Sequence, residues 1–294
     1  STRVRSSAAS DVYKRQAEVE REVGAAIRAA KVKYDLRRLK MISIGHTPQG
    51  FGFGRALDAE MMSTFGTTLD SIEARELINK AKGYTEEELA DELAEARKTI
   101  VGLETIPENN VVNFARLYKA YKSCVGENHI GALCSRCWPD FFTEFGTPVC
   151  SVLSLLNANG VSASCESDAY GALSMFIGSD LTSRSCFFGD PVSMNEKEGT
   201  ITFWHCGMAA CDLARKDTGA QVGVPPNRKI GPVMDFGCEA CEHVTIFRVG
   251  RKPDGSFRFF IAEGSALDKP KQFNGTSVVV KTVESAKDLP LIHI

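Results

Sequence analysis

The chain has 294 residues, a formal net charge of −2 and 24% charged residues, which is typical of a globular protein with one large domain or two ordinary ones. The balanced charge argues against nucleic acid or an anionic membrane as the main partner. No apolar run reaches the roughly 20 residues of a membrane-spanning helix.

The two ends of the chain differ from the rest of the sequence. Residues 1–16 are basic, rich in serine and without periodicity, and we expect a non-native or disordered leader there. Residues 289–294 stop where the pattern of a new helix begins. We therefore expect a fragment of a longer protein, and the fold prediction omits both segments.

The part of the chain from 17 to 180 alternates between helical and strand patterns. The spacing of apolar residues predicts a helix over 17–30 and a short buried strand over 41–44. Further helices are predicted at 111–121, 150–157 and 168–177, and further strands at 129–133, 161–165 and 185–188. Such alternation indicates a parallel sheet covered by helices, so we predict a Rossmann-like α/β domain over 17–180.

The pattern changes after Asp190. Strands are predicted without helices between them, at 200–204, 243–249, 256–261 and 277–280. Lys252 to Gly255 reads Lys-Pro-Asp-Gly, a hairpin-turn signature. We therefore predict a second domain over 181–294, mostly antiparallel β, barrel-like and truncated.

The ten cysteines indicate a reducing compartment. No apolar signal peptide opens the chain, and several cysteines lie inside apolar runs, so we expect free buried thiols in the cytoplasm. The pairs Cys134/Cys137 and Cys238/Cys241 are separated by about 100 residues rather than the roughly 15–20 of a typical zinc site. A zinc or redox protein is therefore the weaker hypothesis.

Two carboxylates follow predicted strands. Glu166 comes directly after the strand over 161–165, and Asp190 comes shortly after the strand over 185–188. Open α/β sheets bind ligands at the carboxyl ends of their strands, so neighbouring strands would bring the two side chains into one crevice. The more ordinary explanation is a helix cap and a turn residue before a proline.

Three sequence blocks carry a resemblance to a known family. They are Cys-Trp-Pro-Asp-Phe at 137–141, Cys-Glu-Ser-Asp-Ala-Tyr-Gly-Ala-Leu-Ser-Met at 165–175, and Cys-Phe-Phe-Gly-Asp at 186–190. In this order and spacing, over about residues 40–285, the chain resembles the L-fucose and L-arabinose isomerases. The resemblance implies a metal-dependent aldose–ketose isomerase in which Glu166 and Asp190 bind Mn²⁺, or another divalent cation, and shuttle the proton.

The chemistry of such an enzyme explains these residue types. A proton moves between C1 and C2 of an open-chain sugar through an enediol, and a cation stabilises the developing negative charge. One carboxylate removes the proton while another manages a hydroxyl proton. Oxygen ligands with one imidazole suit Mn²⁺ better than a thiolate site does.

Three aromatic or acidic side chains are further candidates. L-arabinose isomerases have a metal-binding histidine at a similar place to His205, so the resemblance makes His205 a candidate for contact with metal or substrate, although a lone histidine beside aromatics is more often part of the core. Trp138 is a candidate for stacking on a sugar, with a core anchor as the more ordinary explanation. Asp168 is expected to support Glu166 rather than bind metal. The family's third ligand is a histidine near the carboxyl terminus, and we find no counterpart for it, because His293 lies in the omitted segment 289–294 and lacks the surrounding motif.

The resemblance also sets expectations for partners. It implies a monosaccharide substrate, a cytoplasmic enzyme and a homo-oligomer, trimeric or hexameric, with sites at subunit interfaces. The glycine-rich loop over 45–54 lacks a phosphate-binding signature, so we expect it to line the sugar site or a subunit contact. The alternative function is a non-catalytic sugar-binding α/β module.

Overall fold

The structure is a computed structural model that describes residues 2–225 and 228–283. Its α-helices are α1 (Thr2–Leu36), α2 (Asp58–Phe65), α3 (Ala74–Lys82), α4 (Ala90–Thr99), α5 (Glu108–Asn128), α6 (Cys150–Ala158) and α7 (Ala169–Thr182). Its strands are β1 (Lys40–Ile44), β2 (Thr68–Ile72), β3 (Ala132–Ser135), β4 (Ser162–Ser164), β5 (Asp190–Asn195), β6 (Thr200–His205), β7 (Val222–Gly223), β8 (Val233–Met234), β9 (Cys241–Arg251), β10 (Phe257–Ala266) and β11 (Thr276–Thr282).

The first four strands form a parallel sheet in the order β2-β1-β3-β4. Successive residues of β1 point to opposite faces, as the pleat of a strand requires. Ile42 and Ile44 pack with Phe114 of α5 and Leu153 of α6, whereas Met41 packs with Leu173 of α7. Helices therefore cover both faces, and the chain leaves β1 at the point where the strand order reverses, the usual ligand-binding edge of such sheets.

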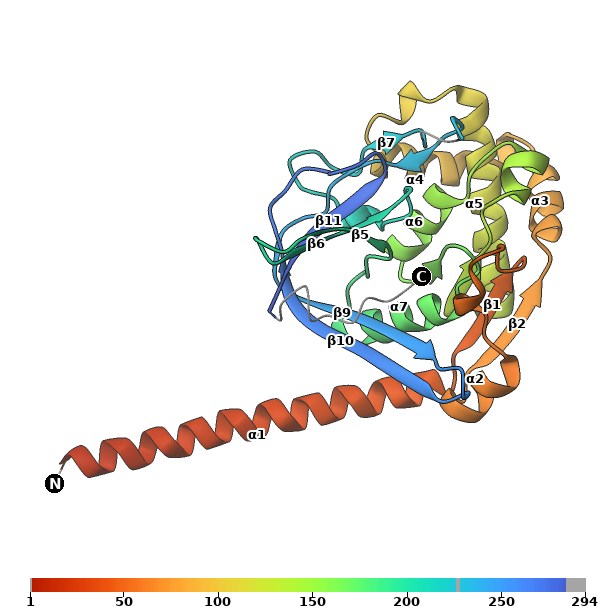
Figure 1. Cartoon of the computed structure of the whole chain (residues 1–294). Coiled ribbons are helices and arrows are strands. Elements are labelled where there is room, and N and C mark those ends of the chain that lie inside the picture. The colour runs from red at the N-terminus through yellow and green to blue at the C-terminus, as the bar shows by residue number, and fades with distance from the viewer. Residues whose placement is uncertain (1, 226–227, 284–294) are drawn as a thin grey trace.

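A five-stranded antiparallel sheet follows, in the order β5-β6-β11-β10-β9. Strand β9, at one edge of this sheet, packs on α7, and Figure 1 shows the β9–β10 hairpin passing beside that helix. The backbone N–H of Val249 donates a hydrogen bond of 2.9 Å to Ser174 Oγ. Helix α7 thus holds the antiparallel sheet against the parallel one.

The prediction of a parallel α/β part followed by antiparallel strands is confirmed. The predicted strand over 185–188 is wrong, because these residues form the loop between α7 and β5. Cys186, Phe187 and Phe188 are half-buried against the core, so burial rather than strand formation explains their apolar run. The Rossmann-like and barrel-like descriptions, and the division near residue 180, stay predictions.

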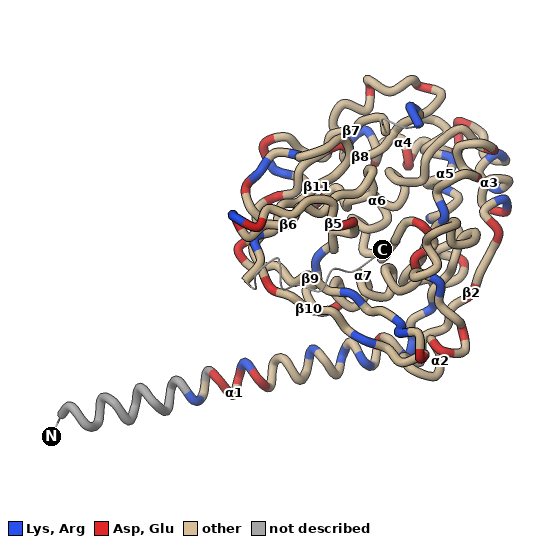
Figure 2. The backbone as a smooth tube through the Cα atoms, viewed as in Figure 1, with Lys and Arg blue, Asp and Glu red and all other residues tan. Residues whose placement is uncertain are grey.

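Helix α1 contains the helix predicted over 17–30, and it extends away from the rest of the molecule (Figure 1). Its apolar residues Val19, Val23 and Ile27 are exposed by 52–64%. Figure 2 shows acidic and basic residues interspersed along the coloured part of this helix and over both sheets. None of the described helices combines the length and apolarity needed to cross a membrane. The predictions for 289–294 and His293 lie outside the described residues.

Candidate active site

The turn between β4 and α7 positions Glu166. Both Glu166 and Ser167 have left-handed backbone conformations, with φ of 56° and 50°. Such conformations cost about 1–3 kcal/mol each in residues with a Cβ atom, and they concentrate at functional sites. Ser167 Oγ donates a hydrogen bond of 3.2 Å to the carbonyl of Ile44, at the end of β1, which helps to fix the turn. As predicted, Glu166 lies at the carboxyl end of a parallel strand.

Asp168 begins α7 and has two sets of partners. Its Oδ1 accepts a hydrogen bond of 2.8 Å from the backbone N–H of Gly171, which is an N-cap. Arg248 of β9 donates two further bonds to the same carboxylate, of 2.6 and 3.1 Å. The Asp168 side chain is only 3% exposed. This carboxylate therefore ties the start of α7 to β9, and its predicted role in supporting Glu166 stays a prediction.

His205 ends β6 and points at Glu166. Its Nε2 lies 3.4 Å from Glu166 Oε1, and the imidazole is 3% exposed. On the other side of the ring, Nδ1 lies 3.6 Å from Cys206 Sγ. Gly275 (φ +108°) packs so closely here that a Cβ on it would lie 2.5 Å from the His205 carbonyl oxygen. The structure therefore brings His205, at the end of β6 in the antiparallel sheet, next to Glu166, in the turn that follows β4 of the parallel sheet.

Asp190 reaches the same region by a route that the sequence did not predict. It is the first residue of β5 and is paired with Trp204, the neighbour of His205. Gly189 permits this close approach, since a Cβ there would lie 2.7 Å from the Trp204 carbonyl oxygen. The expectation that Asp190 follows a parallel strand next to that of Glu166 is therefore wrong. Antiparallel pairing with β6 places it near the site instead.

The electrostatics of the two carboxylates differ. Burial opposes the charged form of Glu166, but the charge of His205 and its hydrogen bond outweigh burial, so the pKa of Glu166 lies below its usual value. Burial raises the pKa of Asp190; His205 opposes this rise, and Glu166 adds to it. Carboxyl groups whose pKa values are moved apart can serve as a base and an acid at one pH.

His205 is held in its charged form in this arrangement. Burial disfavours the imidazolium, yet the adjacent Cys206 and Glu166 together keep the pKa of His205 well above its ordinary value. A divalent cation between His205 and Glu166 would replace this proton, because metal ligands must be deprotonated.

Within residues 2–225 and 228–283, one group of three potential metal ligands has all its ligand atoms within 4.8 Å of one another: Cys165, Glu166 and His205. The 3.4 Å between the Glu166 oxygen and the His205 nitrogen fits two neighbouring ligands of one ion. Cys165 suits a metal less, because hydrogen bonding to Cys137 and burial raise the pKa of its thiol. Asp190 is outside this group.

A row of thiols underlies the site and was not predicted as a unit. Cys137 Sγ lies 3.9 Å from Cys150 Sγ, which lies 3.8 Å from Cys206 Sγ beside His205. Hydrogen bonding from Cys150 and the charge of His205 outweigh burial and lower the pKa of Cys206 to about 6. The signal in the sequence is Cys206 directly after the candidate histidine. All ten cysteines are free, as expected.

The Cys134/Cys137 pair should serve packing only. Both thiols are buried, and neither belongs to the ligand group around Glu166. We expect the double variant Cys134→Ala/Cys137→Ala to lose about 1–3 kcal/mol of unfolding free energy in urea titrations, because two apolar contacts disappear. The kcat of any reaction that the chain catalyses should stay within about twofold of the parent value, because a twofold change in rate corresponds to well under 1 kcal/mol in the activation barrier. Loss of turnover in a folded double variant would restore the redox or zinc hypothesis.

Trp138 lies outside the core. Its side chain is 42% exposed, and the Arg228 guanidinium lies 3.4 Å from the centre of its ring. The core-anchor interpretation is therefore wrong, because a cation–π contact at the surface, rather than burial, holds the ring. The substrate-stacking role stays a prediction.

Two cavities open at the carboxyl end of β1, and both include Gly45 and His46 from the loop that was predicted to line the sugar site or a subunit contact. The first, of about 530 Å³, is lined by Ser43, Gly45, His46, Thr47, Arg55, Ala56, Leu57, Asp58, Leu69, Asp70, Ser71, Ser167 and Ala169. The second, of about 510 Å³, is lined by Gly45, His46, Glu73, Ala74, Arg75, Glu76, Asn79, Arg136, Asp140 and Glu144. Ser167, which follows Glu166 in the sequence, is one of the residues that line the first cavity.

Comparison with known proteins gives a consistent set of relatives. The chain is 64% identical over 260 residues to the sulfoquinovose isomerase of Clostridium sp. (strain MSTE9). The aligned region covers 88% of this chain and 58% of that protein. It is 40% identical over 266 residues to the sulfoquinovose isomerase of Alkalicoccus urumqiensis, covering 90% of this chain and 59% of the relative. It is also 40% identical over 263 residues to that of Priestia aryabhattai, covering 89% and 58%. No family model matches the chain.

These relatives correct the resemblance on which the sequence interpretation relied. They are named sulfoquinovose isomerases, so the assignment to L-fucose and L-arabinose isomerases is wrong. The blocks that suggested it contain the carboxylates Glu166 and Asp190, and carboxylates serve proton transfer in many classes of enzyme, so they do not identify one family. The chain spans about 58% of the length of these relatives.

Proposed function

We propose that this chain carries the proton-transfer residues of an aldose–ketose isomerase acting on sulfoquinovose, a sulfonated deoxyhexose by its name. The observation that carries the proposal is the meeting of Glu166 and His205, 3.4 Å apart, at the carboxyl end of a parallel strand. The relatives named sulfoquinovose isomerase support the reaction type and the sugar.

Glu166 is the proposed base for the proton that moves between C1 and C2. The left-handed turn aims it at His205, and the 24% exposure of its side chain leaves it within reach of a substrate. Asp190 is the proposed partner that exchanges the hydroxyl proton of the enediol. Each such role contributes about 10²–10⁴-fold to the rate.

We further propose that a divalent cation, Mn²⁺ or a similar hard ion, is held by Glu166 and His205, with Asp190 nearby. The fit rests on the donor set, which offers a carboxylate oxygen and an imidazole nitrogen at a spacing suited to one ion. When bound, such an ion would acidify the C–H bond and stabilise the negative charge of the enediol. The neutral thiol of Cys165 would remain outside the set of strong ligands.

The alternative of a non-catalytic sugar-binding module has less support. A binding module needs hydrogen-bond donors and apolar faces for the sugar, but not a buried imidazole opposite a carboxylate at a strained turn. The monosaccharide substrate is part of this proposal. The expectations of a cytoplasmic location and a trimer or hexamer stay predictions.

Metal removal tests the cation directly. We expect chelation with EDTA to reduce conversion of sulfoquinovose to the ketose by at least about 10²-fold, and added Mn²⁺ to restore it, because the ion stabilises the developing charge. Product formation followed by NMR measures the rate. Unchanged activity after exhaustive chelation would exclude the metal, while activity towards no aldose with any divalent cation would contradict the isomerase proposal itself.

A further inference from the structure

One side chain that lines the cavity beside Ser167 is a cation, Arg55, without a partner in the described part of the chain. The guanidinium of Arg55 has neither a hydrogen-bond nor an ion-pair partner among the residues that the structure describes. The residue is exposed in the loop before α2. A guanidinium offers five N–H donors in a plane, which suits an oxyanion with several equivalent oxygens.

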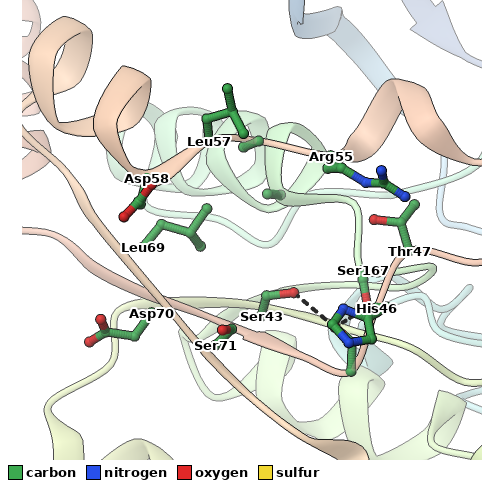
Figure 3. A pocket seen from close by; sticks show the side chains of 13 residues that line it. Ser43, His46, Thr47, Arg55, Leu57, Asp58, Leu69, Asp70, Ser71 and Ser167 are labelled. Atoms are coloured by element: carbon green, nitrogen blue, oxygen red, sulfur yellow. Dashed lines mark hydrogen bonds between the residues drawn. The ribbon is translucent and has the colours of Figure 1, made fainter.

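The charges in this cavity are separated in space. Figure 3 shows Arg55 and Thr47 at one end, with His46 and Ser167 below them, while Asp58 and Asp70 lie at the opposite end. The acidic side chains are therefore displaced from the guanidinium rather than placed against it. An anion at the Arg55 end would also find a hydroxyl donor in Thr47.

The second cavity offers no comparable cation. Arg75 donates two bonds of 3.1 Å to Glu144, and Arg136 lies 2.8 Å from Asp140. These guanidinium groups already have carboxylate partners, so a new anion would have to displace one of them. Of the two cavities, the first is thus the better site for an anion.

The position of the first cavity relates it to the proposed chemistry. Ser167 lines it, and the Cα atoms of consecutive residues are about 3.8 Å apart, so the cavity adjoins the turn that carries Glu166. Neither Glu166 nor His205 lines the cavity itself, so a substrate with its reacting carbons at those residues would have to extend its other end past Ser167 to enter this space. The volume of about 530 Å³ lies within the range of small-molecule sites.

We infer that the Arg55 end of this cavity binds the sulfonate group of the sugar. The inference rests on the proposed function for the identity of the sugar, and on the unpaired guanidinium and separated charges for the position of its anionic end. Arg55 is then a specificity residue, since it touches the part of the substrate that distinguishes a sulfonated sugar from an ordinary one.

The test compares two sugars that differ by one group, sulfoquinovose and quinovose, by calorimetric titration of the full 294-residue chain. Arg55→Met removes the charge and keeps the apolar stem, and Arg55→Lys keeps a charge without the planar fork. Arg75→Met is the matched control, an arginine of the second cavity. Urea unfolding of each variant checks the fold.

We expect Arg55→Met to weaken sulfoquinovose binding by about 10- to 100-fold and to change quinovose binding by less than about twofold. Arg55→Lys should fall between the parent and the Met variant, and Arg75→Met should change neither affinity. Equal loss for both sugars, no loss for either, a selective loss in Arg75→Met, or no sulfoquinovose binding by the parent chain would overturn the inference. If the parent binds sulfoquinovose through Arg55 and still fails to isomerise it, the sulfonate site stands and the proposed function fails.

Discussion

Glu166→Gln should lower the kcat for sulfoquinovose isomerisation by about 10²- to 10⁴-fold while leaving the fold intact. The amide keeps the size of the side chain, but it can neither accept the proton nor balance the charge of His205, which lies 3.4 Å away. If a divalent cation binds here, the amide is also a weaker ligand, so the Mn²⁺ requirement should rise. Single-turnover measurements at saturating sugar would isolate the chemical step.

Glu198→Gln is the matched control for this variant. Glu198 is exposed in the turn between β5 and β6, away from the ligand group. The same chemical change there should leave kcat within about twofold of the parent chain. A Glu166→Gln enzyme that retains more than about a tenth of the parent kcat would show that Glu166 is not the base.

Arg248→Met should lower the unfolding free energy by about 3–5 kcal/mol, because it leaves the buried carboxylate of Asp168 without its cation. The Asp168 side chain is 3% exposed, and the N-cap bond from Gly171 compensates only part of the loss. Urea titrations monitored by circular dichroism give the free energy. The kcat should also fall, since the helix that follows the Glu166 turn loses its contact with β9.

Arg251→Met provides the comparison on the same strand. Arg251 makes two bonds of 2.7 Å to Glu60, but both side chains are about one-third exposed, and the pair should contribute only about 1 kcal/mol or less. Equal losses of unfolding free energy in the two variants would mean that burial does not make the Asp168–Arg248 ion pair contribute more to stability than the exposed pair. A loss below about 1 kcal/mol in Arg248→Met would contradict the prediction outright.

The sequence predicted regular elements well where local pattern and burial agree. The strands around Ile42 and Ala163 and the helix after Asp168 appear as expected, because their apolar residues are buried within regular elements of the parallel sheet and its covering helices. The position of Glu166 followed from this, since only the local order of strand and turn was needed.

The sequence could not predict what depends on pairing between distant segments. Phe187 and Phe188 are apolar because they cover the core from a loop, and local pattern does not separate this from a strand. The place of Asp190 is set by antiparallel pairing with Trp204, and the partner of Asp168 lies 80 residues further along, on β9. That Arg55 has no partner among the described residues is likewise visible only in three dimensions.

The left-handed turn at Glu166 and Ser167 makes activity a reporter of complete folding. Ser167 Oγ bonds the carbonyl of Ile44, which is 123 residues earlier in the chain, so the turn is fixed only when β1 is already in its place. In a partly folded chain nothing holds these two residues in their unfavourable conformations, and they would relax to ordinary ones. During refolding, recovery of turnover should therefore lag behind recovery of helical circular dichroism.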